Sequence, residues 1–252
     1  MKKGPGRALL LALAVAALAG CSTTVKSPAA SGTQTVQHLT DSGRRLDYLL
    51  WLPRDYAPGS NKTWPMIMFL HGAGERGADV WKAATHGPPK RIAQGWECPF
   101  IVVSPLCPER EDWERDRLVE LLNEIVRKYA VDQQRVYLTG LSMGGYGAWD
   151  LGLKFPEKFA AMAPICGGGE YISVLLAGRE KPNALKSLAV WAFHGDKDPV
   201  VPVSESERMV GFLRTAGVRE VKLTVYPGVE HNSWTQTYDN PDLYEWFLKH
   251  SR

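Results

Sequence analysis

Short apolar runs alternate along the chain with amphipathic stretches, and this alternation predicts the fold class. Residues 36–39 and 45–52 predict two antiparallel strands joined by a turn at residues 41–43. Residues 65–70 contain no polar side chain, which is typical of a strand buried on both faces. Further strands are predicted at residues 100–104, 135–138, 159–165, 188–193 and 221–226.

The segments between these strands carry helical patterns. In residues 116–129 the apolar positions fall on one helical face. Further helices are predicted at residues 144–154, 204–215 and 242–250, and one near the end of the glycine-rich stretch 72–95. Strands that alternate with helices predict the α/β class, with a mostly parallel sheet of eight strands and helices on both of its faces.

The first 35 residues do not fit this pattern. Residues 1–20 join a basic start to an apolar run that is too short for a membrane span of about 20 residues, so they are expected to be a signal peptide. The sequence Leu-Ala-Gly-Cys at residues 18–21 resembles the lipobox of bacterial lipoproteins, which implies lipidation of Cys21. Residues 21–35 are expected to be a flexible tether, and residues 36–252 to be the globular domain. Ser22 in place of Asp implies an outer-membrane location facing the periplasm, with membrane contact through the lipid alone.

Charge and cysteine content bear on which partners and which catalytic groups the chain can have. Without residues 1–20 the chain has 27 basic and 27 acidic residues, and it shows no basic stripe, so we expect no nucleic-acid partner. Cys98, Cys107 and Cys166 remain after Cys21. A predicted strand separates the first two by more than the roughly 7 Å that a disulfide allows, so we expect neither a disulfide nor a catalytic thiol.

The strongest local motif is Gly-Leu-Ser-Met-Gly at residues 140–144, which lies between a predicted strand and a predicted helix. This is the context of a nucleophile elbow, in which a sharp turn exposes the serine hydroxyl above the sheet. The flanking glycines leave room for that turn. Ser142 is therefore the predicted nucleophile; the alternative is a glycine-rich turn without one.

A serine nucleophile needs a base, and the elbow fold places its residues in the order nucleophile, acid, base. That order leaves His194, His231 and His250. His231 follows the last predicted strand, where this fold supplies its base, and is the predicted residue. Asp196 and Asp198 both follow the preceding strand, and spacing alone does not separate them as the acid that orients the imidazole.

Two backbone N–H groups are expected to bind the oxyanion of the tetrahedral intermediate. Met143 follows the nucleophile and supplies one of them. The glycine-rich loop after residue 70 is expected to supply the other from Ala73, unless this loop is merely flexible. Glu75 and Arg76 in the same loop are expected either to form an ion pair or to contact substrate.

Three stretches, at residues 69–77, 140–149 and 163–169, are similar to the α/β-hydrolase superfamily, and the resemblance covers residues 36–250. Within it the chain resembles bacterial phospholipase/carboxylesterase and feruloyl-esterase-like proteins, some of them described as prolyl-oligopeptidase-like or dienelactone-hydrolase-like. The resemblance implies a serine carboxylesterase that uses an acyl-enzyme and no metal or organic cofactor. It also favours Asp198 as the acid. A serine in place of cysteine at position 142 argues against dienelactone hydrolase activity.

The expected substrates are short-chain, aryl or carbohydrate-linked carboxylic esters. About twenty residues separate Cys166 from Leu188, too few for a lid domain, so an open and shallow site is expected. Four loop tryptophans are predicted either to wall that site or to cover the core edge: Trp81, Trp96, Trp113 and Trp234. The alternative functions are a serine peptidase of prolyl-oligopeptidase-like type and a non-catalytic binding lipoprotein of the cell envelope.

Overall fold

In the part of the chain that the structure describes, eight strands form one open sheet in the order β1-β2-β4-β3-β5-β6-β7-β8. β2 pairs antiparallel with β1 and β4, and the remaining neighbours are parallel. The predicted fold class is confirmed. The strands are β1 (Gln34–Asp41), β2 (Arg44–Trp51), β3 (Trp64–Leu70), β4 (Ile101–Pro105), β5 (Val131–Leu141), β6 (Ala161–Ile165), β7 (Ala189–Gly195) and β8 (Val221–Tyr226).

This computed structural model describes residues 1, 2, 4, 29–41 and 44–252. The predicted signal peptide and Cys21 lie outside the described residues, as does most of the predicted tether. β1 begins at Gln34, two residues before the boundary that the sequence predicted for the domain. Among the described helices, each is too short or too polar to cross a bilayer.

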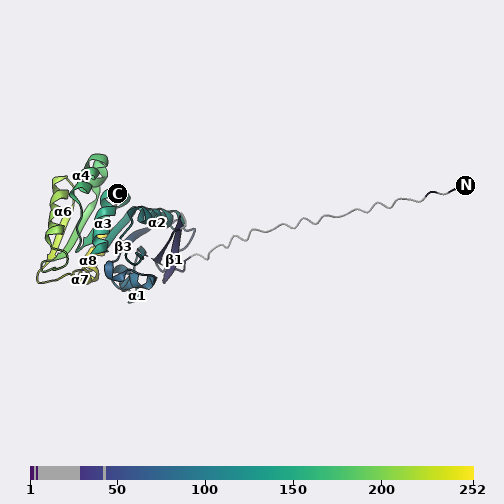
Figure 1. Ribbon diagram of the computed structural model, residues 1–252, viewed down its shortest axis with the longest axis horizontal. Coiled ribbons are helices and arrows are strands. Elements are labelled where there is room, and N and C mark those ends of the chain that lie inside the picture. Colours follow the sequence, from purple (N-terminus) through teal and green to yellow (C-terminus); the bar gives the residue numbers. More distant parts are fainter. Residues whose placement is uncertain (3, 5–28, 42–43) are drawn as a thin grey trace.

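Helices pack on both faces of the sheet (Figure 1). The α-helices are α1 (Gly87–Ala93), α2 (Arg115–Lys128), α3 (Met143–Lys154), α4 (Tyr171–Glu180), α5 (Pro182–Ser187), α6 (Ser204–Thr215), α7 (Trp234–Asp239) and α8 (Pro241–Leu248). Three 3₁₀-helices accompany them: η1 (Ala73–Glu75), η2 (Val80–Ala84) and η3 (Pro156–Lys158).

The core is divided by the sheet, as β3 shows most clearly. Every residue of β3 is buried, and successive side chains point to opposite faces. Met66, Met68 and Leu70 join the apolar cluster that contains residues of α2, α3 and α6. Ile67 and Phe69 join the cluster that contains residues of α7 and α8. The continuous apolar run in the sequence is therefore explained by burial on both sides.

β3 and β5 are central neighbours, and their register determines where chemistry can occur. Leu70 pairs with Gly140 at the carboxyl ends of the two strands. The loop that follows Leu70 therefore lies beside the turn that contains Ser142. In open α/β sheets this edge is where ligands bind.

Candidate active site

Ser142 occupies a strained turn between β5 and α3. Its backbone has φ 52° and ψ −116°, a conformation that non-glycine residues rarely adopt. A Cβ atom at Gly140 would collide with the carbonyl oxygen of Gly144, and one at Gly144 would collide with that of Leu70. The two glycines of the motif are therefore required by the closeness of three backbone segments, as the elbow interpretation expects.

The structure brings Ser142, His231 and Asp198 together from three separate loops. The Oγ atom of Ser142 lies 2.9 Å from Nε2 of His231. Nδ1 of the same ring lies 2.7 Å from Oδ2 of Asp198. An ionised carboxylate only accepts hydrogen bonds, so Nδ1 carries the proton and Nε2 is free to accept the serine hydroxyl. This is the tautomer that a general base requires.

The Asp198 carboxylate is fully buried and held by its own loop. Its Oδ1 atom accepts the backbone N–H groups of Val200 at 2.8 Å and Val201 at 2.9 Å. Burial raises the pKa of Asp198, but the hydrogen bonds from His231 and from these two N–H groups outweigh burial and lower the pKa below its ordinary value. Asp198 is therefore ionised wherever the imidazole is a useful base.

The other candidates have different contacts. Oδ1 of Asp196 accepts the backbone N–H of Gly228 at 2.7 Å, which links two loops. His194 is fully buried, with Nδ1 2.7 Å from Oγ of Ser206 and Nε2 2.9 Å from the carbonyl of Val201. It therefore supports the loop that carries Asp198. His250 pairs with Glu220 at 2.9 Å, near the end of the chain.

Glu75 and Arg76 hold the loop that contains Ala73 in place. Oε2 of Glu75 accepts the backbone N–H of Gly72 at 2.9 Å. Nε of Arg76 donates to the carbonyl of Ala73 at 3.2 Å, and its Nη1 donates to the carbonyl of Glu111 at 2.9 Å. Both side chains therefore bind backbone rather than each other.

The N–H groups proposed for the oxyanion both stand at helix starts. Ala73 is the first residue of η1 and Met143 is the first residue of α3. The first N–H groups of a helix have no acceptor within the helix, so they can bind an anion. Because Leu70 and Gly140 are paired, the two starts lie at the same edge of the sheet.

The buried side chain of His71 holds the same loop in place. It is fully buried, and its Nε2 atom accepts the backbone N–H of Cys107 at 3.0 Å, while Nδ1 donates to the carbonyl of Gly72 at 2.7 Å. Burial lowers the pKa of His71 to about 4, so the ring is neutral at pH 7. The indole N–H of Trp113 donates to the carbonyl of His71 at 3.1 Å and adds a second anchor.

The four loop tryptophans do not share one role. Trp113 lines a cavity of about 540 Å³ that is also lined by Met143, the residue after Ser142. Trp234 instead packs against the rings of His231 and His86, each at 5.3 Å between centroids. Trp96 packs on Tyr244 at 4.4 Å, and Trp81 is 49% exposed.

The aromatic partners of Trp113 in the cavity are Tyr146 and Trp149. Both come from α3, and in the sequence they stand out only as part of the elbow motif. α4 and α5 occupy the segment between β6 and β7, where a lid would be inserted. A cavity of about 540 Å³ is in the range of sites for drug-sized ligands.

The three described cysteines are free and buried. Among the described residues, Cys166 lies with Asp198 and His231 in a group whose candidate ligand atoms are within 4.8 Å of one another. Burial raises the pKa of Cys166 to about 12, which keeps it as a thiol, whereas metals bind the thiolate. The hydrogen bond between Asp198 and His231 also occupies the other two groups. We assign no metal to this group.

Comparison with known proteins places these residues in a family. The model of the phospholipase/carboxylesterase family matches residues 113–240, which is just over half of the chain and includes Ser142, Asp198 and His231. The chain belongs to the phospholipase/carboxylesterase family. It is thus a serine hydrolase of esterase type.

Individual relatives are esterases at modest identity. The chain is 29% identical over 215 residues to a probable feruloyl esterase C of Aspergillus terreus, covering 82% of this chain and 72% of that protein. It is 26% identical over 181 residues to a bifunctional acetylxylan esterase/xylanase of Neocallimastix patriciarum, covering 69% of this chain but 24% of that protein. The solved structure of a thermostable esterase is similar with a TM-score of 0.73 and 32% identity, covering 87% of this chain and 63% of the other.

Proposed function

We propose that this protein is a carboxylesterase that forms an acyl-enzyme on Ser142. The observation that carries the proposal is the continuous hydrogen-bonded series from Asp198 through His231 to Ser142, with distances of 2.7 and 2.9 Å. The strained elbow at Ser142 supports it, because backbone strain of this kind persists at sites where it serves a mechanism.

The proposed reaction has two halves. Oγ of Ser142 attacks the ester carbonyl carbon while Nε2 of His231 takes the hydroxyl proton, and Asp198 stabilises the resulting imidazolium. The N–H groups of Ala73 and Met143 bind the oxyanion. The intermediate collapses, the C–O bond to the alcohol breaks, and His231 returns the proton to the leaving oxygen. Water then attacks the acyl-enzyme in the same way and releases the acid and free Ser142.

We propose short-chain, aryl or carbohydrate-linked carboxylic esters as substrates. The feruloyl esterase and acetylxylan esterase relatives support aryl and carbohydrate-linked esters. The cavity beside Ser142 supports a substrate whose larger part is bound next to the reacting carbonyl.

A panel of p-nitrophenyl esters of increasing acyl length, assayed with wild type and Ser142→Ala, tests this proposal. We expect hydrolysis by the wild type that declines with acyl length, and a loss of at least about 10⁴-fold in the variant. A fluorophosphonate probe is expected to label the wild type only. Equal rates for the two proteins would contradict the assignment of the nucleophile. Cleavage of a prolyl-nitroanilide without any ester hydrolysis would favour a peptidase, and lack of labelling would favour a binding protein.

We also propose that Cys21 carries a lipid that anchors the domain to the outer membrane on its periplasmic side. The resemblance of residues 18–21 to a lipobox supports this. Metabolic labelling with a radioactive fatty acid is expected to mark the wild type and to leave Cys21→Ser unmarked. Labelling of both proteins would contradict the anchor at this position.

A further inference from the structure

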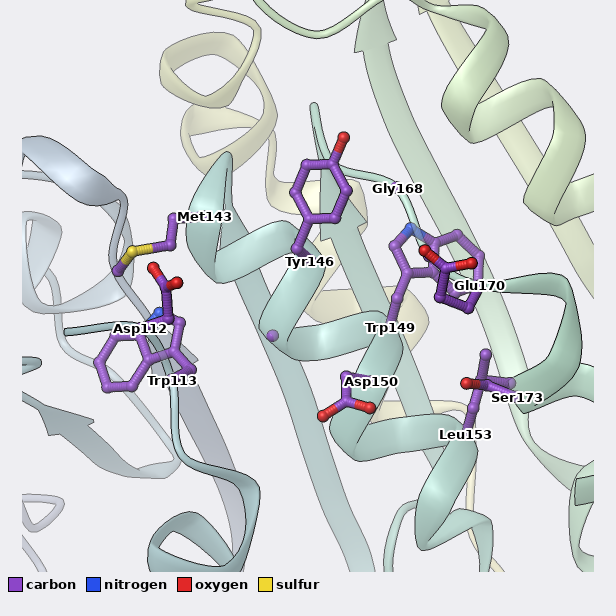
Figure 2. A pocket seen from close by; sticks show the side chains of 12 residues that line it. Asp112, Trp113, Met143, Tyr146, Trp149, Asp150, Leu153, Gly168, Glu170 and Ser173 are labelled. Atoms are coloured by element: carbon purple, nitrogen blue, oxygen red, sulfur yellow. The ribbon is translucent and has the colours of Figure 1, made fainter. Parts of the chain in front are cut away.

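The cavity beside Ser142 is a groove that follows one face of α3 (Figure 2). It starts at Met143, one residue after the nucleophile, and continues over Tyr146, Asp150 and Leu153. These positions are three or four apart, so they share one face of the helix. Ser142, Asp198 and His231 do not themselves line the groove, but Met143 joins its end to the nucleophile, so a ligand that lies along α3 can reach the proposed reacting position.

One end of the groove offers flat aromatic surfaces. The indole N–H of Trp113 is hydrogen-bonded to the carbonyl of His71, which fixes the orientation of the ring. A Cβ atom at Gly147 would lie 2.9 Å from Cδ1 of Trp113, so the missing side chain lets the indole pack against the helix. Tyr146 follows on the same helix and is 41% exposed. A ligand can lie against these rings without displacing either one.

The polar groups of the groove are mainly carboxylates. Asp112, Asp150 and Glu170 line it, and no Lys, Arg or His of the described chain does. Figure 2 shows Asp150 on α3 and Glu170 beyond Trp149, on the side opposite Trp113. An anionic ligand would be repelled, so phosphorylated or free carboxylate groups are poor candidates for this position.

The negative charges of two of these carboxylates are partly neutralised by arginines that lie outside the lining. Asp150 pairs with Arg115 at 2.8 Å, and Asp112 lies 3.7 Å from Arg76. These cations reduce the attraction for an ammonium group, while the carboxylate oxygens still have lone pairs that accept hydroxyl protons. The hydroxyl of Ser173 adds a group that can donate. The groove thus suits a neutral ligand that both donates and accepts hydrogen bonds.

We propose that this groove binds the sugar ring of a carbohydrate ester, with the acyl carbonyl placed at Ser142. The C–H face of a pyranose lies against Trp113 and Tyr146, and its hydroxyl groups donate to Asp150 and Glu170. The volume of about 540 Å³ is far more than a short acyl group requires. This inference rests on the proposed esterase function and specifies which alcohol the substrate carries.

Acetate esters of different alcohols isolate the contribution of the groove, because the acyl group is constant. We compare an acetylated methyl pyranoside, choline acetate, 3,3-dimethylbutyl acetate and p-nitrophenyl acetate. The wild type is expected to hydrolyse the pyranoside ester with a kcat/KM at least about tenfold above that for 3,3-dimethylbutyl acetate. Tenfold corresponds to about 1.4 kcal/mol, the contribution of one good hydrogen bond to a charged group.

Variants of the lining test whether this preference arises in the groove. Glu170→Ala and Tyr146→Ala are each expected to lower the ratio of kcat/KM for the pyranoside ester over that for p-nitrophenyl acetate by about five- to tenfold. Glu207 is an exposed acidic residue on α6 and does not line the groove, so Glu207→Ala is the matched control and is expected to keep the wild-type ratio. Equal ratios in all four proteins would overturn the proposal.

Binding to Ser142→Ala separates the groove from the chemistry. Calorimetric titration with the acetylated pyranoside is expected to show binding that Glu170→Ala in the same background weakens. Absence of binding overturns the groove proposal. If p-nitrophenyl acetate is nevertheless hydrolysed by the wild type, the esterase function stands. A preference for choline acetate over 3,3-dimethylbutyl acetate would overturn the sugar in favour of a cationic alcohol. Binding without hydrolysis of any ester would support the groove but contradict the proposed function.

Discussion

The carboxylate of Glu75 accepts the backbone N–H of Gly72 at 2.9 Å and so closes the turn that presents Ala73. From the other side, Arg76 donates to the carbonyl of Ala73 at 3.2 Å. The peptide group before Gly72 and the one after Ala73 are thus each held by a side chain, and they flank the peptide group that carries the Ala73 N–H. Glu75 is therefore a positioning residue for one of the proposed oxyanion donors.

Removal of this carboxylate is expected to reduce kcat more than it changes KM. Loss of a whole oxyanion donor costs about 10²–10³ in kcat, and a donor that is misaligned should cost less, so we expect about 10- to 100-fold for Glu75→Ala. Glu75→Gln keeps an oxygen that can accept the Gly72 N–H and should lose less. Steady-state kinetics with p-nitrophenyl acetate measure both. An increase in KM with unchanged kcat would show instead that Glu75 contributes to substrate binding.

Asp198→Asn is expected to lower kcat by about 10⁴-fold. Two backbone N–H groups require an oxygen at the Oδ1 position, so the amide nitrogen of the variant would face Nδ1 of His231. Nδ1 would then have to accept a hydrogen bond from the amide. The imidazole proton would move to Nε2, where it would prevent abstraction of the Ser142 proton. Asp196→Asn is the control, since Asp196 binds only the loop at Gly228 in the contacts described above. Similar losses in both variants would contradict the assignment.

Stability is expected to fall at acidic pH partly through His71. The ordinary pKa of histidine is about 6.5, and burial lowers that of His71 to about 4 in the folded protein. Between these values the unfolded chain binds a proton that the folded chain does not, so the free energy of unfolding decreases as pH falls through this range, by up to about 3 kcal/mol. Protonation of Nε2 would also break its bond with the Cys107 N–H.

Urea denaturation at pH 7, 5.5 and 4.5 measures this dependence. His71→Asn removes the titrating group, so the difference in unfolding free energy between wild type and variant should shrink as the pH falls. A difference that stays constant would indicate that other groups cause the acid sensitivity.

Two glycines on different helices provide a matched pair for the elbow. Gly144→Ala is expected to destabilise the protein by several kcal/mol or to prevent folding, because the new Cβ atom would collide with the carbonyl of Leu70. Gly211 lies inside α6, and among the described residues nothing beyond the helix's own backbone lies within 4 Å of where its Cβ atom would be, so Gly211→Ala is expected to stabilise by about 0.5–1 kcal/mol. Thermal unfolding compares the two. A well-folded Gly144→Ala variant would show that the turn has more space than its geometry indicates.

The fold was predictable because the chain encodes it locally. The consecutive apolar residues of β3 indicate a strand buried on both faces, and the glycines around Ser142 indicate a turn with no room for side chains. β5 begins at Val131, whereas the sequence predicted a start at residue 135. The start was missed because residues 132–134 are polar, and these residues lie where the register of β5 with β3 shifts. α4 was missed because Ile172, Leu175 and other apolar side chains are exposed on it, so no single buried face marks the helix.

The candidate site was only partly predictable. Motif and chain order pointed to Ser142 and His231, but the distinction between Asp198 and Asp196 depends on how the loop after β7 turns back on itself. The groove combines a loop residue, Trp113, with one face of α3 and the segment before α4. These parts meet only in the folded protein, and no local pattern records that they share a surface.

The ring of Trp234 packs against the rings of both His231 and His86, and His86 in turn lies 3.5 Å from Glu75. One indole thus links the proposed base to the residue that holds the Ala73 loop. Substitutions at His86 and Trp234 should therefore show energetic coupling: the effect of the double variant on kcat/KM should fall short of the product of the single effects. A substitution at either residue that is made to alter specificity would therefore change the surroundings of both His231 and Glu75.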